Sequence, residues 1–138
     1  MWINVNYLAI LVAAVASFAL GWLWYSPALF AKIWMSEMGM TPEKMAAMPK
    51  SGMAKQFSLS FLGGLIMAWV LAVLISRVGA NSLIGGLKLG AFVWLGFIAT
   101  VQMSDILFGG KSKKLYLINT GYNLVSLLLM GVILALWV

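Results

Sequence analysis

Asp105 has the clearest potential for chemistry, because it is the one acid inside a long apolar stretch of this sequence. An ionisable side chain is costly in hydrocarbon, so it usually binds a solute, carries a proton or pairs with another polar group. Gln102 lies three residues earlier and therefore on the same expected helix face. With neutral polar residues of the other apolar stretches, Asp105 predicts a small polar pocket, whose further candidate members are Gln102, Asn119, Asn123, Tyr122, Tyr25, Gln56 and Ser60.

Two interpretations of Asp105 stay open on the sequence. It binds a solute or a proton inside the pocket, or it pairs with Lys111 or Lys114 and anchors the adjacent turn. Asn and Gln side chains within membrane spans commonly bond a neighbouring helix, for about 0.6 kcal/mol each. We therefore favour the structural interpretation.

The residue types that most catalysis and metal binding require are missing. The chain has no Cys and no His, which removes the thiolate nucleophile, the commonest general base and the commonest metal ligand. Met residues are concentrated between Met35 and Met53, but thioethers without Cys or His make an incomplete Cu(I) site. No phosphate-binding loop and no paired intramembrane carboxylates are present. We expect no enzyme activity, no cofactor and no metal site.

Composition indicates the elements that must position these residues. Of the 138 residues, 64% are hydrophobic and 9% are charged, whereas about 25% are charged in soluble domains. Lipid must therefore cover much of the surface. A helix crosses the hydrocarbon core with about 20 mostly apolar residues. Residues 1–138 are thus predicted to form a single all-α membrane domain, a four-transmembrane-helix bundle with spans at about 7–25, 56–76, 83–108 and 115–137.

The connection between the first two spans, residues 26–55, is long and patterned. It contains Pro27, a residue suited to the first position of a helix. Apolar Phe30, Ile33 and Trp34 then follow at helical spacing, with Lys32 and Glu37 on the other side. This amphipathic pattern predicts a helix over residues 28–39 that lies in the membrane interface.

Basic residues are distributed unevenly between the two sides of the expected bundle. Connections 26–55 and 109–114 carry seven Lys, whereas Arg77 and Lys88 belong to the opposite side. Because basic residues concentrate in cytoplasmic connections, both termini are expected outside and the polar pocket in the cytoplasmic half. This asymmetry accounts for the net charge of +6. Without a basic stripe interleaved with aromatic residues, we expect no nucleic-acid binding.

Small residues at four-residue spacing predict close helix contacts, because they let two backbones approach. The same spacing recurs on all four spans. It is typical of packing within one bundle, and a homodimer seam or contact with a partner membrane protein is the alternative. The residues concerned are Ala9, Ala13, Ser17 and Gly21 on the first span, then Ser60 with Gly64, Gly86 with Gly90, and Gly131 with Ala135.

The chain also contains a candidate internal repeat. Residues 26–31 resemble 104–109, and residues 65–72 resemble 128–135. Each repeat would be a helix pair, so both would insert in the same direction and be related by an axis along the membrane normal. Apolar sequences also match by chance, and superposition of the two helix pairs distinguishes these explanations.

Residues 21–34, with the sequence Gly-Trp-Leu-Trp-Tyr-Ser-Pro-Ala-Leu-Phe-Ala-Lys-Ile-Trp, resemble the opening signature of the bacterial membrane proteins grouped as domain-of-unknown-function family 1761. Residues 105–108, 117–119 and 121–122 resemble its second signature. Family members often carry Glu-Gly-Arg where this chain has residues 109–111, Gly-Gly-Lys, which puts an acid–base pair at this turn in doubt. The resemblance implies a multi-pass protein of the bacterial cytoplasmic (inner) membrane, and it implies no activity, substrate or cofactor.

The sequence therefore favours a non-enzymatic structural or accessory membrane protein in the lipid bilayer, with a small polar pocket on the cytoplasmic side. The alternative is a small homo-oligomeric transporter or channel that uses Asp105. A water-accessible cavity reaching Asp105 would favour transport, whereas a dry, hydrogen-bonded cluster would favour the accessory role.

The predicted topology can be tested by labelling single cysteines, since the chain has none of its own. A membrane-impermeant maleimide should label a Ser82→Cys variant in intact cells. It should label a Ser112→Cys variant only after the membrane is permeabilised. Labelling of the second variant but not the first in intact cells would invert the topology.

Overall fold

The structure is a computed structural model that describes residues 5–39, 43, 50–110 and 112–137, and this part of the chain is helical throughout apart from short turns. Among these residues, four helical stretches are long and apolar enough to cross a membrane. This confirms the predicted all-α class with four candidate spans. The stretches are α1 (Tyr7–Trp24), α4 (Lys50–Val78), α5 (Leu83–Trp94) continuing through the π-helix η1 (Leu95–Ala99) into α6 (Thr100–Leu107), and α7 (Lys113–Leu136).

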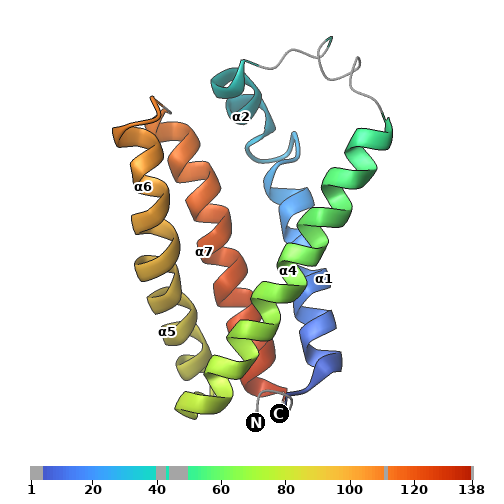
Figure 1. Ribbon diagram of the computed structural model, residues 1–138, viewed down its shortest axis with the longest axis vertical. Helices are drawn as coiled ribbons and strands as arrows, with labels where there is room; N and C mark the ends of the chain where they lie inside the picture. The colour runs from blue at the N-terminus through green and yellow to red at the C-terminus, as the bar shows by residue number, and fades with distance from the viewer. Residues whose placement is uncertain (1–4, 40–42, 44–49, 111, 138) are drawn as a thin grey trace.

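Successive long helices run in opposite directions (Figure 1). α1 begins, and α7 ends, at the same end of the bundle as the turn between α4 and α5. The short helix α2 (Ala31–Met38) lies at the opposite end, near the turn between α6 and α7. Local sequence sets these boundaries, because the side chains of Asn6, Ser82 and Ser112 accept hydrogen bonds from backbone N–H groups at the helix starts.

α7 is the central helix, and it packs against α1, α4 and α5. The small residues of α1 allow this, since Ala9 and Ala13 are 0% exposed in a core shared with α4 and α7. Ser17 is also buried, and Gly21 is half-buried against the ring of Tyr122. The remaining core residues are Ile10, Ala68, Leu71, Ala72, Ile75, Leu127, Met130, Leu134 and Ala135.

The closest helix contact joins α5 to α7 through glycines. A Cβ atom on either Gly86 or Gly131 would overlap the carbonyl oxygen of the other residue. A Cβ on Gly90 would lie 2.7 Å from the carbonyl oxygen of Leu127. Only glycine permits this approach, which is how small residues act at helix interfaces in membranes.

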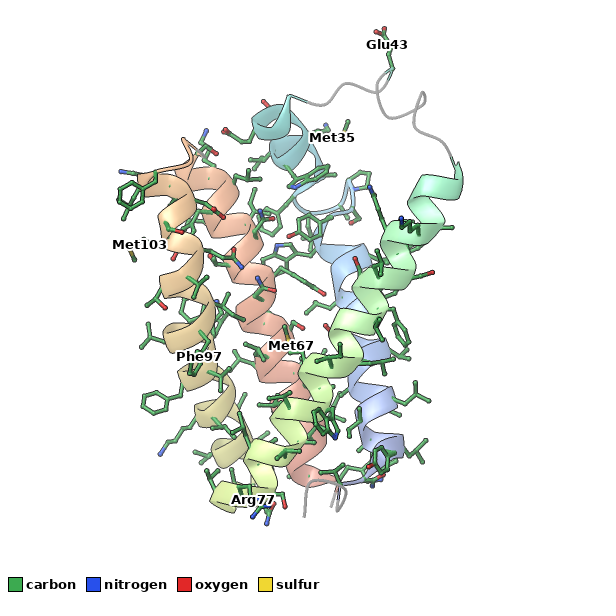
Figure 2. All side chains as sticks on the ribbon, in the orientation of Figure 1. Met35, Glu43, Met67, Arg77, Phe97 and Met103 are labelled. Carbon is green, nitrogen blue, oxygen red and sulfur yellow. The ribbon has the colours of Figure 1, made fainter. Side chains whose placement is uncertain are left out.

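A π turn interrupts the third span, and no sequence pattern predicted it. Counting in steps of 3.6 from buried Gly90, an uninterrupted α-helix would turn residues near 94, 97, 101 and 104 toward α7. The extra residue of the π turn rotates the following helix instead. Phe97 is 74% exposed and points away from the bundle (Figure 2), whereas Ala99 is buried and Gln102 half-buried.

α4 packs against the bundle through only one half of its length. Its residues from Ala68 to Ile75 contribute to the core, whereas residues 54–60 are all exposed. In Figure 1, α4 accordingly crosses α7 obliquely and diverges from it toward the α2 end. The divergence separates α4 from α1 and α7 in that half of the bundle.

α2 supplies the helix expected within residues 28–39, but it begins at Ala31 because turn hydrogen bonds occupy residues 26–30. It ends at Gly39, whose φ of 68° favours glycine. Its location in the membrane interface stays a prediction, as does the internal repeat. Much of the Met-rich stretch lies outside the described residues, as does Lys111.

We expect Gly86→Ala to destabilise the bundle by about 1–3 kcal/mol, because the new methyl group overlaps α7. Gly63→Ala is the matched control, since a Cβ there meets no atom within 4 Å. It should leave stability unchanged or raise it by about 0.5–1 kcal/mol through helix propensity. Unfolding by SDS in mixed micelles measures both changes. Equal stability of the two variants would contradict the close α5–α7 contact.

Candidate functional site

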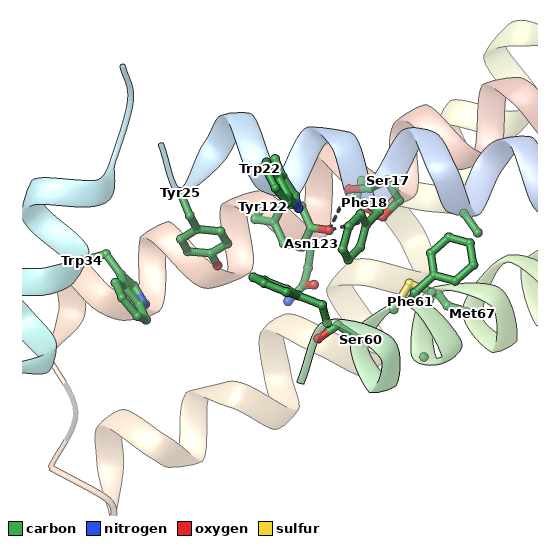
Figure 3. Close-up of a pocket in the computed structure, with 16 residues that line it drawn as sticks. Ser17, Phe18, Trp22, Tyr25, Trp34, Ser60, Phe61, Met67, Tyr122 and Asn123 are labelled. Carbon is green, nitrogen blue, oxygen red and sulfur yellow. Dashed lines mark hydrogen bonds between the residues drawn. The ribbon is translucent and has the colours of Figure 1, made fainter. Parts of the chain in front are cut away.

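The divergence of α4 leaves a cavity of about 850 Å³ between α1, α4 and α7, with Trp34 of α2 at one end. Figure 3 shows its lining. One part of the lining is aromatic and another consists of neutral polar groups. The polar residues are Ser17, Tyr25, Ser60, Tyr122, Asn123 and Ser126, and the aromatic residues with purely apolar faces are Phe18, Trp22, Trp34, Phe57 and Phe61.

The aromatic wall joins α1 to α4. Phe18 of α1 packs nearly perpendicular to Phe57 and Phe61 of α4, with ring centroids 6.2 Å and 5.8 Å apart. Trp22 lies 6.0 Å from Phe57. The two edge-to-face contacts of Phe18 have a favourable geometry for aromatic pairs. They hold the two helices together where the backbones have already separated.

The polar wall joins α1 to α7. The Ser17 and Ser126 hydroxyls share a hydrogen bond of 2.5 Å, and the Tyr122 hydroxyl donates to the Ser17 carbonyl oxygen at 2.9 Å. These groups lie within membrane-spanning helices, where water does not reach them and a partner must come from the protein. The pairing therefore fixes α1 on α7 and leaves these hydroxyls satisfied.

Tyr25 and Trp24 extend this contact toward α2. The Tyr25 hydroxyl donates to Oδ1 of Asn119 at 2.7 Å, and the Trp24 indole N–H donates to the Ile118 carbonyl oxygen at 2.9 Å. The Tyr25 ring in turn packs against Trp34, with centroids 6.0 Å apart at 69°. α2 is thus held at the end of the cavity by an aromatic contact.

The structure brings together only part of the polar set chosen from the sequence. Tyr25, Tyr122, Asn123 and Ser60 line the cavity, and Asn119 is linked to it through Tyr25. Gln56 is exposed on α4, one residue before Phe57, and lies outside the lining.

Asp105 and Gln102 are also outside the cavity lining, on α6. Asp105 was expected at the bundle interior or at a polar mouth on the cytoplasmic side, and in the structure it is exposed in the last turn of α6 while Gln102 is half-buried. No residue of α6 is buried, so this end of the third span leaves Asp105 outside the core. Lys114, one of the two cations considered for Asp105, is exposed at the start of α7.

Sequence reasoning missed the aromatic wall. Its signal was present as two pairs at the i, i+4 spacing, Phe18 with Trp22 and Phe57 with Phe61, since residues four apart share a helix face. Ser126, by contrast, shares a helix face with Asn119 and Asn123, as their spacing in the sequence predicts. That these faces meet around a cavity depends on the divergence of α4, which no local pattern encodes.

Among the residues that the structure describes, the cavity lining carries no Asp, Glu, Lys or Arg. Among the described residues, no group of three or more Asp or Glu side chains gathers that could hold a metal ion. The lining offers aromatic surface, hydroxyls and one amide. Such a set can bind and orient an uncharged molecule.

The comparisons with known proteins identify a family but no activity. The family model described as "Protein of unknown function (DUF1761)" matches residues 8–135, nearly the whole chain. No curated protein and no solved structure matches.

The pairing of Tyr25 with Asn119 can be measured by a double-mutant cycle. Tyr25→Phe, Asn119→Ala and the double variant should reveal a coupling of about 0.6 kcal/mol, and at most about 1.7 kcal/mol, which is the range found for hydrogen bonds between membrane helices. SDS unfolding provides the free energies. Ser104→Ala is the control, because its hydroxyl donates only to Val101 of its own helix. Zero coupling would mean that the two side chains do not bond.

Proposed function

This chain belongs to the DUF1761 family of proteins of unknown function, and from that premise we propose that it is a non-enzymatic accessory membrane protein that acts by binding other components of the bilayer. Its four apolar helices make it a multi-pass membrane protein. The family assigns no chemistry to it, so the proposal rests on the geometry of the cavity.

The neutral lining of the cavity is the observation that carries the proposal. The hydroxyls of Ser17, Ser126 and Tyr25 are engaged in hydrogen bonds between helices. Acid–base catalysis needs a group whose pKa lies near the working pH, and the described part of the lining offers no carboxylate, amine or imidazole. A site of this composition suits recognition of a membrane component.

The charge distribution supports an orientation with both termini outside a bacterial cytoplasmic membrane. Lys32, Lys55 and Lys113 are exposed at the α2 end of the bundle, whereas Arg77 and Lys88 are exposed toward the other end. Basic residues favour the cytoplasmic side. In this orientation α2 lies at the cytoplasmic interface with Lys32 and Ile33 exposed, and the cavity is in the cytoplasmic half.

A homo-oligomeric transporter or channel that uses Asp105 is the second candidate. The π turn favours it, because π turns in α-helices are frequent at functional sites and this one sets the face that Gln102 and Asp105 present. An exposed acid within a span would suit a second copy that encloses it. Against this candidate, Asp105 lies outside the cavity lining.

Native mass spectrometry in mild detergent tests the proposal, since it measures subunits and retained molecules together. We expect the chain to retain a bilayer component, either a lipid-sized molecule or a partner membrane protein. A chain stripped of every such component under conditions that preserve its fold would contradict the accessory role.

Asp105→Asn separates the two candidates. We expect the variant to fold and assemble like the wild-type protein, because an amide keeps most of the hydrogen-bonding capacity of the carboxylate. In proteoliposomes carrying a pH-sensitive dye, neither protein should add to the proton leak of empty vesicles. A wild-type proton flux that the substitution abolishes would overturn the accessory function in favour of transport.

A further inference from the structure

We propose that the cavity between α1, α4 and α7 is a binding site for a neutral amphiphile whose polar end carries carbonyl oxygens. This rests on the proposed accessory function and names the bilayer component that the protein binds. Quinones carry this chemistry in a neutral molecule. Bulk phospholipid, whose ester carbonyls adjoin a charged head group, is the other source, and the experiment below distinguishes it from a neutral ligand.

The dimensions and the aromatic surface of the cavity suit a small amphiphile. A volume of about 850 Å³ falls within the range of about 300–1,000 Å³ that is usual for small-molecule sites. Phe18, Trp22 and Phe57 supply flat apolar surface along one side. Because the cavity lies among membrane-spanning helices, the apolar part of a ligand can enter it directly from lipid and need not pass through water.

The absence of charge from the lining restricts the occupant to a neutral molecule. None of the described lining residues is Asp, Glu, Lys or Arg, and burial of an unpaired charge is strongly unfavourable. A phosphate or ammonium head group would therefore have to stay outside the cavity. The portion of the ligand that the cavity holds is uncharged.

The polar groups left available in the cavity require a hydrogen-bond acceptor. Figure 3 shows the Asn123 amide directed from α7 toward α4, on which Ser60 lies. Within the described part of the chain, neither side chain has a protein hydrogen-bond partner, in contrast to Ser17 and Tyr25. An amide NH₂ and a hydroxyl together offer three polar hydrogens. Carbonyl oxygens of a ligand between them would satisfy these donors in a site that water does not readily supply.

Glycines keep this space open. A Cβ on Gly63 or Gly64 meets no atom within 4 Å, although both residues line the cavity. Gly86 is needed for a close contact between two helices, whereas Gly64 makes no such contact within the chain. A larger side chain at this position would extend into the cavity without displacing a helix, which makes Gly64→Leu a substitution that occupies the site.

The test uses purified full-length protein in dodecyl maltoside micelles and follows tryptophan fluorescence, because Trp22 and Trp34 line the cavity. The probes are decylubiquinone and decylbenzene, which share a decyl chain on a six-membered ring; only the quinone ring carries carbonyl oxygens, together with methoxy and methyl groups. We expect saturable quenching by decylubiquinone. Decylbenzene, titrated as a competitor, should displace decylubiquinone only at concentrations at least tenfold above those at which decylubiquinone itself binds.

Three variants locate the binding. Gly64→Leu should abolish saturable quenching, whereas Gly96→Leu should leave it unchanged, because Gly96 is equally open but lies on η1 outside the cavity. Asn123→Leu should weaken decylubiquinone binding about three- to tenfold, which corresponds to the loss of one neutral hydrogen bond. Thermal melting of each variant verifies that the fold is intact.

Each contrary outcome overturns the proposal in a different way. Equal competition by decylbenzene would exclude recognition of carbonyl oxygens. Absence of saturable quenching, with phospholipid retained in native mass spectra, would assign the cavity to bulk lipid. Loss of a dimer in Gly64→Leu but not in Gly96→Leu would assign it to a second copy. These failures leave the accessory function standing, whereas an Asp105-dependent flux would overturn that function separately.

Discussion

Inside lipid, a polar group without a protein partner costs several kcal/mol, and α7 supplies partners to helices on both of its sides. Its backbone carbonyls at Ile118 and Thr120 accept from the indole N–H groups of Trp24 and Trp94, the latter at 2.7 Å. Its Tyr116 hydroxyl donates to the carbonyl oxygen of Ala99 at 2.7 Å, at the end of the π turn. The arrangement of α1, α5 and the π turn follows from these bonds to one central helix.

The two sides of α7 are packed differently, and this difference creates the cavity. Gly86 and Gly131 bring α5 so close to α7 that no side chain separates them. α4 contributes buried residues only from Ala68 to Ile75, and before them the rings of Phe57 and Phe61 pack against Phe18 of α1. The two halves of α4 therefore have different neighbours, and the cavity lies beside the aromatic half.

The π turn separates α5, which packs closely against α7, from α6, which has no buried residue. Beyond the π turn Gln102 is half-buried and Asp105 is exposed. At the turn itself the Thr100 hydroxyl donates to the Gly96 carbonyl oxygen at 2.7 Å. Asp105 and the cavity are therefore separate features of the molecule. A binding role for the cavity and a role for Asp105 at the turn are compatible, because they use different helices.

The sequence by itself determined the membrane class, the four spans, the family and the helix-starting residues, because hydrophobicity, length and capping are local properties. It also identified the small residues of α1 and the polar face of α7, which the structure brings together through Ser17 and Ser126. The site was only half predictable: Tyr25, Ser60, Tyr122 and Asn123 line the cavity, but the aromatic wall was missed, and Asp105 is exposed on α6 outside the cavity lining. The tertiary structure decided these points, because the packing of α6 and the angle of α4 depend on contacts among residues far apart in the chain.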